Sequence, residues 1–107
     1  MQDQFDAISE PRRREILHLV KGRELAAGAI AAAFEDVSRP AISQHLRVLR
    51  ECGLIKERRV GTSRLYRVDP SGFKDLRQFF SAFWDERLEL LKEEVELDER
   101  NTDARFN

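Results

Sequence analysis

The sequence of 107 residues predicts a mostly α-helical fold with one small β-hairpin. Three observations indicate this: a sharply two-sided helix at about 38–53, two strand-like segments between 54 and 68, and a long helix with an apolar stripe at 70–97. Apolar residues make up 41% of the chain, enough for a core. Charged residues reach 36%, so much of the surface is expected to be ionic.

Three helices are expected before the two-sided helix. Apolar residues between positions 5 and 8 indicate a short first helix. Pro11 suits the first turn of a second helix, which Gly22 would end. The alanine-rich segment 25–34 predicts a third helix, although Ala26 is a poor N-cap.

The two-sided helix begins at a polar cap, Ser38, and stops at Gly53. One side of this helix is apolar, with Ile42, Leu46 and Leu49 at helical spacing. The other side carries polar and basic side chains from its first turn onward. They are Arg39, Ser43, Gln44, Arg47 and Arg50.

A β-hairpin is expected directly after this helix. Its strands are 54–60 and 63–68, and Gly61 and Thr62 form the tip. Charge is divided along the chain: residues 39–67 contain eight basic and two acidic residues, a charge of +6, whereas residues 85–107 carry −5. A basic middle and an acidic end suggest a polyanionic partner for the middle alone.

The chemistry of the two-sided helix fits the reading of duplex DNA. In a helix-turn-helix the second helix enters the major groove. Arg47 can bond guanine O6 and N7 together, and Gln44 can do the same with adenine N6 and N7. Ser43 and Arg39 could contact a base edge or a phosphate, and Arg64 beside the hairpin tip a phosphate or the minor groove. The sequence therefore predicts a winged helix-turn-helix.

Four stretches resemble the ArsR/SmtB family of bacterial winged-helix repressors: AISEPRRREILHLV, GRELAAGAIAAAF, SRPAISQHLRVLRECGLI and ERRVGTSRLYRVDP. The resemblance covers roughly residues 3–95, and is greatest to the metal-independent autorepressor branch. It implies a homodimer that represses its own or a neighbouring gene. The implied DNA-contacting residues are Ser38, Arg39, Pro40, Ser43, Gln44, His45 and Arg47, with Arg59 and Arg64 in the wing.

The chain departs from the family pattern at two helix starts. Family members often carry Thr at the position of Ala26 and Glu at that of Ala29, so this helix start should be softer here. The usual Asp before the proline is Glu10, a poorer cap, for which Ser9 could substitute.

No metal or other cofactor is expected. The third helix has no cysteine and the last helix no histidine, so both of the family's usual metal sites lack ligands for a soft transition metal. A single cysteine, Cys52, also excludes an intramolecular disulfide. Cys52 is expected to pack in the core, with a thiol sensor as the alternative. His18 and His45 are expected to be structural, His45 at the helix edge.

Self-association is expected through the last helix. Its apolar residues form two rows, too many for so small a core to cover. The expected dimer contacts are Phe5, Ile8, Phe80, Phe83, Trp84, Leu88 and Leu91. Residues 1–97 are predicted to form the winged-helix domain with its dimerisation helices, and 98–107 a flexible acidic tail.

The function predicted is that of a homodimeric, sequence-specific regulator bound to an inverted-repeat operator in double-stranded DNA. The alternatives are a redox-responsive repressor using Cys52 and a winged-helix module that binds protein. An enzyme is not expected, because Ser43 and His45 diverge by roughly 200° on one helix and no phosphate loop is present. The absence of a signal peptide or long apolar run predicts a soluble, cytoplasmic protein without membrane contact.

Overall fold

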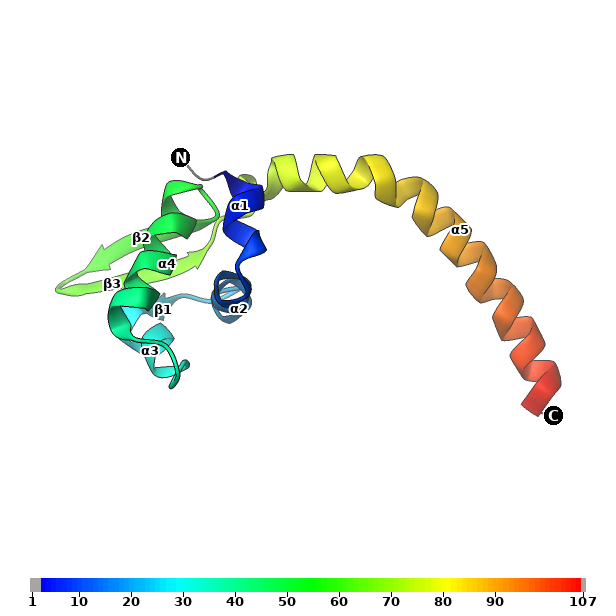
Figure 1. The fold of residues 1–107 in the computed structure, drawn as a ribbon, viewed down its shortest axis with the longest axis horizontal. Helices are drawn as coiled ribbons and strands as arrows, with labels where there is room; N and C mark the ends of the chain where they lie inside the picture. Colours follow the sequence, from blue (N-terminus) through cyan, green and yellow to red (C-terminus); the bar gives the residue numbers. More distant parts are fainter. Residues whose placement is uncertain (1–2, 107) are drawn as a thin grey trace. The chain divides into compact units, whose positions relative to one another are not determined.

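The computed structural model describes the backbone of residues 3–106, and the side chains of residues 3–83 and 89–97. The chain divides into two compact units, residues 1–76 and 77–107, which are described separately. The elements follow one another in the order of Figure 1. They are α1 (Gln4–Ser9), α2 (Pro11–Leu19), β1 (Leu25–Ala26), α3 (Ala27–Ala32), α4 (Arg39–Glu51), β2 (Ile55–Val60), β3 (Ser63–Val68), the 3₁₀ helix η1 (Pro70–Phe73) and α5 (Lys74–Phe106).

A single residue, Glu10, is both the C-cap of α1 and the N-cap of α2. Glu10 is the N-cap of α2, and its carboxylate accepts a hydrogen bond of 3.0 Å from the backbone N–H of Arg12. The expectation that Ser9 would substitute is wrong, because its hydroxyl instead donates to the carbonyl of Asp6 at 2.6 Å. The buried Arg13 donates through Nε to the carbonyl of Ala7 at 2.7 Å, so its charge faces the negative end of α1.

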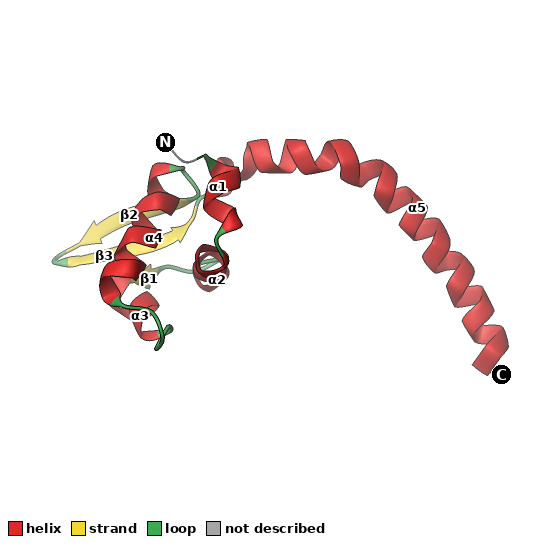
Figure 2. Cartoon of the chain, viewed as in Figure 1, coloured by secondary structure: helices red, strands yellow, loops and turns green. Residues whose placement is uncertain are grey.

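The expected helix at 25–34 is shorter in the structure and is preceded by a strand. Leu25 and Ala26 form β1, which pairs antiparallel with Tyr66 and Leu65 of β3. The predicted hairpin is therefore part of a three-stranded sheet of order β1-β3-β2 (Figure 2). Helix propensity failed here because backbone pairing with β3 takes the two residues before α3, and α3 itself begins without a side-chain cap at Ala26.

Helix α4 has the limits that the sequence predicts. The hydroxyl of Ser38 accepts from the N–H of Ala41 at 3.3 Å. At the other end Gly53 has a φ of +78°, its N–H donates to the carbonyl of Arg50, and the N–H of Leu54 donates to that of Leu49. These are the two bonds of a Schellman motif, which ends the helix and turns the chain into β2.

The core of residues 1–76 lies between α4, the N-terminal helices and the sheet. Its fully buried large side chains are Ile16, Val20, Ile30, Ile42, Leu49 and Leu54. Figure 1 shows α4 between the hairpin and the pair α1 and α2, and α4 contacts β2, α1, α2 and α3. The apolar side of α4 is thus used by the core, which leaves its polar side to solvent.

The last helix starts later than expected. The first turn, Pro70–Phe73, is 3₁₀, and α5 begins at Lys74. Several large apolar side chains of α5 are exposed. They are Phe79, Phe80, Phe83, Leu90, Leu91, Val95 and Leu97. The backbone of α5 continues to Phe106, while a domain boundary at 97 and a flexible tail stay predictions. Among the described residues no helix is long and apolar enough to cross a membrane.

Candidate nucleic-acid interface

The polar side of α4 is open along its length. Most of the predicted contact residues there are exposed. They are Ser38, Arg39, Pro40, Ser43, Gln44 and Arg47. The Nε of Arg47 lies 3.0 Å from a carboxylate oxygen of Glu51, with the two side chains 65% and 58% exposed. A surface ion pair of this kind is worth at most about 1 kcal/mol, so Arg47 remains available to a stronger partner.

His45 is less exposed than the other predicted contact residues of α4. Its ring is half-buried, and its Nδ1 is 3.5 Å from the Nη1 of Arg13 on α2. Burial and the charge of Arg13 lower the pKa of His45, so the neutral ring is favoured. This placement supports the packing role at the helix edge over a base contact.

The wing, defined as β2, β3 and the turn residues Gly61 and Thr62, presents two faces. Its register pairs Arg59 with Arg64 and Glu57 with Tyr66. Because strand side chains alternate, these four residues share the face on which Tyr66 is buried. Both predicted wing arginines are therefore on the α4 side of the sheet, where their like charges lie directly opposite each other and repel.

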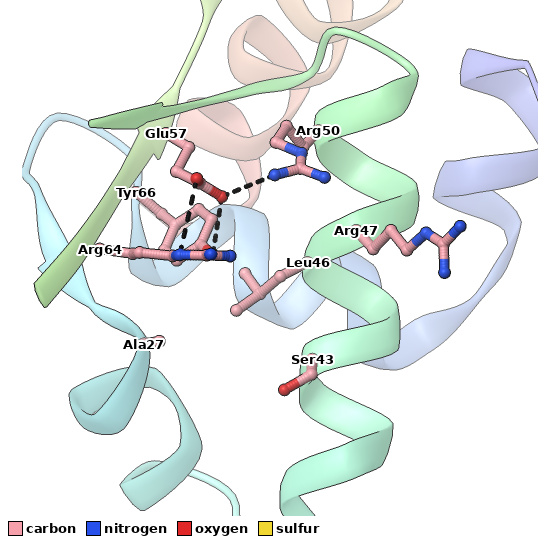
Figure 3. Close-up of a pocket in the computed structure, with 8 residues that line it drawn as sticks. All are labelled: Ala27, Ser43, Leu46, Arg47, Arg50, Glu57, Arg64 and Tyr66. Carbon is pink, nitrogen blue, oxygen red and sulfur yellow. Dashed lines mark hydrogen bonds and ion pairs between the residues drawn. The ribbon is translucent and has the colours of Figure 1, made fainter. Parts of the chain in front are cut away.

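A groove of about 290 Å³ lies between this face of the wing and α4. Figure 3 shows Glu57 joined by dashed lines to Arg50, Tyr66 and Arg64. A carboxylate oxygen of Glu57 accepts from Arg50 Nη1 at 2.9 Å and from the Tyr66 hydroxyl at 3.0 Å, and its second oxygen lies 3.9 Å from Arg64 Nε. In the same view Arg47 points away from this cluster, and Ser43 lies on the α4 wall.

The opposite face of the wing is also paired. Arg58 donates two hydrogen bonds to Glu24, of 2.9 and 2.7 Å, and these hold the pKa of the Glu24 carboxyl below its usual value. Lys56 lies 3.8 Å from Asp69. Among the described side chains, the basic residues of 39–67 with no carboxylate within 4.0 Å are Arg39, Arg59 and Arg67. The net charge of +6 counted for residues 39–67 therefore overstates the positive charge that is free to meet a partner.

Sequence reasoning missed Glu57 and Tyr66 as parts of this surface. Strand alternation and the two-residue turn could have placed both on one face with Arg59 and Arg64. The contact of Glu57 with Arg50 crosses from sheet to helix, and nothing in the sequence pattern reports it.

Cys52 lies at the end of α4 and is buried. Its Sγ is 3.5 Å from the carbonyl of Asp3, and its own carbonyl accepts from Gln4 Nε2 at 2.9 Å. Burial raises the pKa of the thiol, which disfavours the reactive thiolate. No group of three potential metal ligands occurs within the part of the chain that the structure describes.

An exposed, polar-faced helix in a helix-turn-helix, followed at once by an antiparallel hairpin, defines a winged helix-turn-helix protein. Residues 10–57 match the family model described as bacterial regulatory protein, arsR family. The chain is 40% identical over 75 residues to the transcriptional repressor SdpR of Bacillus subtilis (strain 168), which spans 70% of this chain and 82% of that protein.

Solved structures agree. A possible transcriptional regulator for arsenical resistance superposes with a TM-score of 0.71 at 44% identity, over 85% of this chain and 94% of the other. The homodimeric winged helix-turn-helix DNA-binding domain of Mb0332 from Mycobacterium bovis gives 0.59 at 32% identity, over 78% and 77%. The chain belongs to the arsR family of bacterial regulatory proteins. It is a transcriptional regulator with a winged helix-turn-helix, and this family is not one of enzymes.

Proposed function

We propose that this regulator is a homodimeric repressor that binds an inverted-repeat operator in double-stranded DNA, in the bacterial cytoplasm. The observation that carries the proposal is the exposed side of α4 together with two wing arginines, Arg59 and Arg64, on the α4 side of the sheet, of which Arg64 lines the groove. The name of SdpR, a repressor, supports repression, and the homodimeric Mb0332 domain supports a dimer.

The exposed side of α4 is proposed to read bases. The Gln44 amide has the donor and acceptor that match adenine N7 and N6, and the Arg47 guanidinium has two donors that match guanine O6 and N7 in the major groove. Ser38, Arg39 and Pro40 open the helix, where backbone N–H groups and a basic side chain suit phosphate. Ser43 adds a hydroxyl, while Arg59 and Arg64 are proposed to contact the backbone or the adjacent minor groove.

Helix α5 is proposed to form the dimer. Phe80, Phe83 and Leu91 are 46%, 61% and 44% exposed, which is costly for a helix without a partner. Phe79 forms ring contacts with Phe80 and Phe83, so these aromatic side chains form one patch. Trp84 and Leu88, also predicted for this interface, lie outside the described side chains. Phe5 is 37% exposed on α1, and Ile8 packs partly against the core.

A two-fold dimer places two α4 helices on one side of the duplex. The operator should then be an inverted repeat with half-site centres about 10–10.5 base pairs apart, or near a multiple of that. The test is selection of duplexes from a random pool by the full chain, followed by footprinting and sedimentation of the complex. A single unrepeated site bound with full affinity by a monomer would contradict the proposal.

Metal is not proposed as an effector. Zinc, cadmium and arsenite at stoichiometric levels are expected to leave operator affinity unchanged, because the sequence lacks the thiolate and imidazole sets those ions need. A loss of affinity that a chelator reverses would contradict this. The thiol alternative is disfavoured by the burial of Cys52.

A further inference from the structure

The groove between α4 and the wing contains an anion where a DNA-binding surface needs cations. Of the side chains described around this groove, Glu57 is the only carboxylate. Glu57 belongs to β2, on the side of the hairpin that faces α4, and is paired with Tyr66 of β3. Its side chain is 20% exposed. A carboxylate at such a place repels phosphate, so its presence needs an explanation.

The carboxylate stays ionised in this position. Burial alone would raise the pKa of Glu57, but the Tyr66 hydroxyl and the charges of Arg50 and Arg64 outweigh it and lower the pKa below its usual value. Glu57 is thus negatively charged at neutral pH, with two hydrogen-bond donors on one oxygen and the guanidinium of Arg64 at 3.9 Å from the other.

The negative charge of Glu57 acts on two nearby arginines. Arg50, at the last turn of α4, is bonded to Glu57 at 2.9 Å, and Arg64 is drawn toward it at 3.9 Å. Figure 3 shows both guanidinium groups turned to the carboxylate and into the groove. A guanidinium hydrogen-bonded to a half-buried carboxylate, as Arg50 is, neutralises no phosphate and releases no counterion from DNA, whereas Arg64 is only restrained and can still reach phosphate.

We propose that Glu57 is a specificity-determining residue: by occupying Arg50 and restraining Arg64, it weakens binding to DNA of any sequence and so leaves discrimination to the base contacts of α4. This inference rests on the proposed DNA-binding function. Sequence-independent affinity comes almost entirely from phosphate contacts. When part of the positive charge of the surface is paired within the protein, non-specific affinity falls more than specific affinity. The ratio of specific to non-specific affinity therefore rises.

The test is the variant Glu57→Gln in the full chain, whose amide keeps the shape and the ability to accept from Tyr66. Affinity is titrated against salt on two duplexes, the selected operator and one of unrelated sequence. Each freed arginine should steepen the slope of log affinity against log salt by about 0.9 and raise affinity for unrelated DNA on the order of fivefold at 0.15 M salt. Operator affinity should rise less, because α4 already fixes the register there, so the specificity ratio should fall.

A matched control is Glu24→Gln. It changes the net charge by the same amount and frees Arg58, which lies on the opposite face of the wing. It should alter the unrelated-DNA slope less than Glu57→Gln does. An equal effect of the two variants would show a response to net charge alone, and would overturn the role given to Glu57.

A double-mutant cycle identifies the cation. Arg50→Gln should change unrelated-DNA affinity little in the native chain, where Glu57 already occupies Arg50, but should remove most of the gain in Glu57→Gln. Additive effects would overturn the inference.

A structural role gives a different pattern. If Glu57 only fixes the wing on α4, Glu57→Gln will lower operator affinity without steepening the slope on unrelated DNA, and the inference fails while the proposed function stands. If the native chain shows no salt-dependent binding to either duplex, the proposed function itself fails.

Discussion

The start of α3 offers a direct test of the local energetics. Ala26 is the N-cap, with φ −69° and ψ 151°, and no side chain accepts from the first turn. In Ala26→Thr the new hydroxyl can accept from the N–H of Gly28 or Ala29, as the hydroxyl of Ser38 does from Ala41 at α4. Ala26 is half-buried and paired with Leu65, so a β-branched side chain suits its backbone.

The expected gain is about 0.5–2 kcal/mol in the free energy of unfolding. For a chain of this size, each 1 kcal/mol corresponds to a rise in Tm of about 4–8 °C. The assay is denaturant and thermal unfolding at one fixed protein concentration, because the proposed dimerisation would contribute to stability.

Ala26→Val is the matched control, since valine has the branch and nearly the volume of threonine but no acceptor. Threonine should exceed valine by about 0.5–2 kcal/mol. If valine stabilises as much as threonine, the effect comes from strand pairing or burial, and the cap at residue 26 is misassigned.

Three further outcomes are expected. Gly72→Ala should destabilise severely, because an added Cβ would lie 1.9 Å from the carbonyl oxygen of Gly53, whereas Gly28→Ala meets nothing within 4 Å and should stabilise by about 0.4–1 kcal/mol; unfolding curves of the two variants test the contrast. Burial and Arg13 depress the pKa of His45, so the unfolded chain binds the proton more readily and stability should be lost as pH falls below the ordinary value of 6.5. Melts at about pH 7.5 and 5.5 should show a larger loss of stability for the native chain than for His45→Gln. The thiol of Cys52, buried and with a raised pKa, should react slowly with iodoacetamide until denaturant is added; fast alkylation of the native chain would revive the thiol-sensor alternative.

Local signals were enough to predict α4 and the hairpin. Ser38 and Gly53 each act within one turn of the helix they limit, and a two-residue turn sets the register of the whole hairpin. Strand β1 could not be predicted, because Leu25 and Ala26 pair with residues about forty positions away and carry no strand pattern of their own.

The candidate site was predicted in its residue types but not in its charge. The exposed side of α4 follows from helical periodicity, whereas ion pairs such as Arg58 with Glu24 join distant segments. Counting residues 39–67 alone omitted Asp69 and Glu24, which pair with Lys56 and Arg58. His45 illustrates the same limit, since its half-buried position depends on Arg13 of another helix.

The central claim is that α4 reads bases in the major groove. It is tested most directly by measuring the affinity of Arg47→Ala for the selected operator and for every single-base variant of one half-site. The expected result is a loss of about 1–3 kcal/mol on the operator and relaxed preference at one base pair, while Arg64→Ala weakens all sequences alike and lowers the salt slope by about one unit. A uniform loss across all sequences for Arg47→Ala, with unchanged preference at every position, would contradict the account.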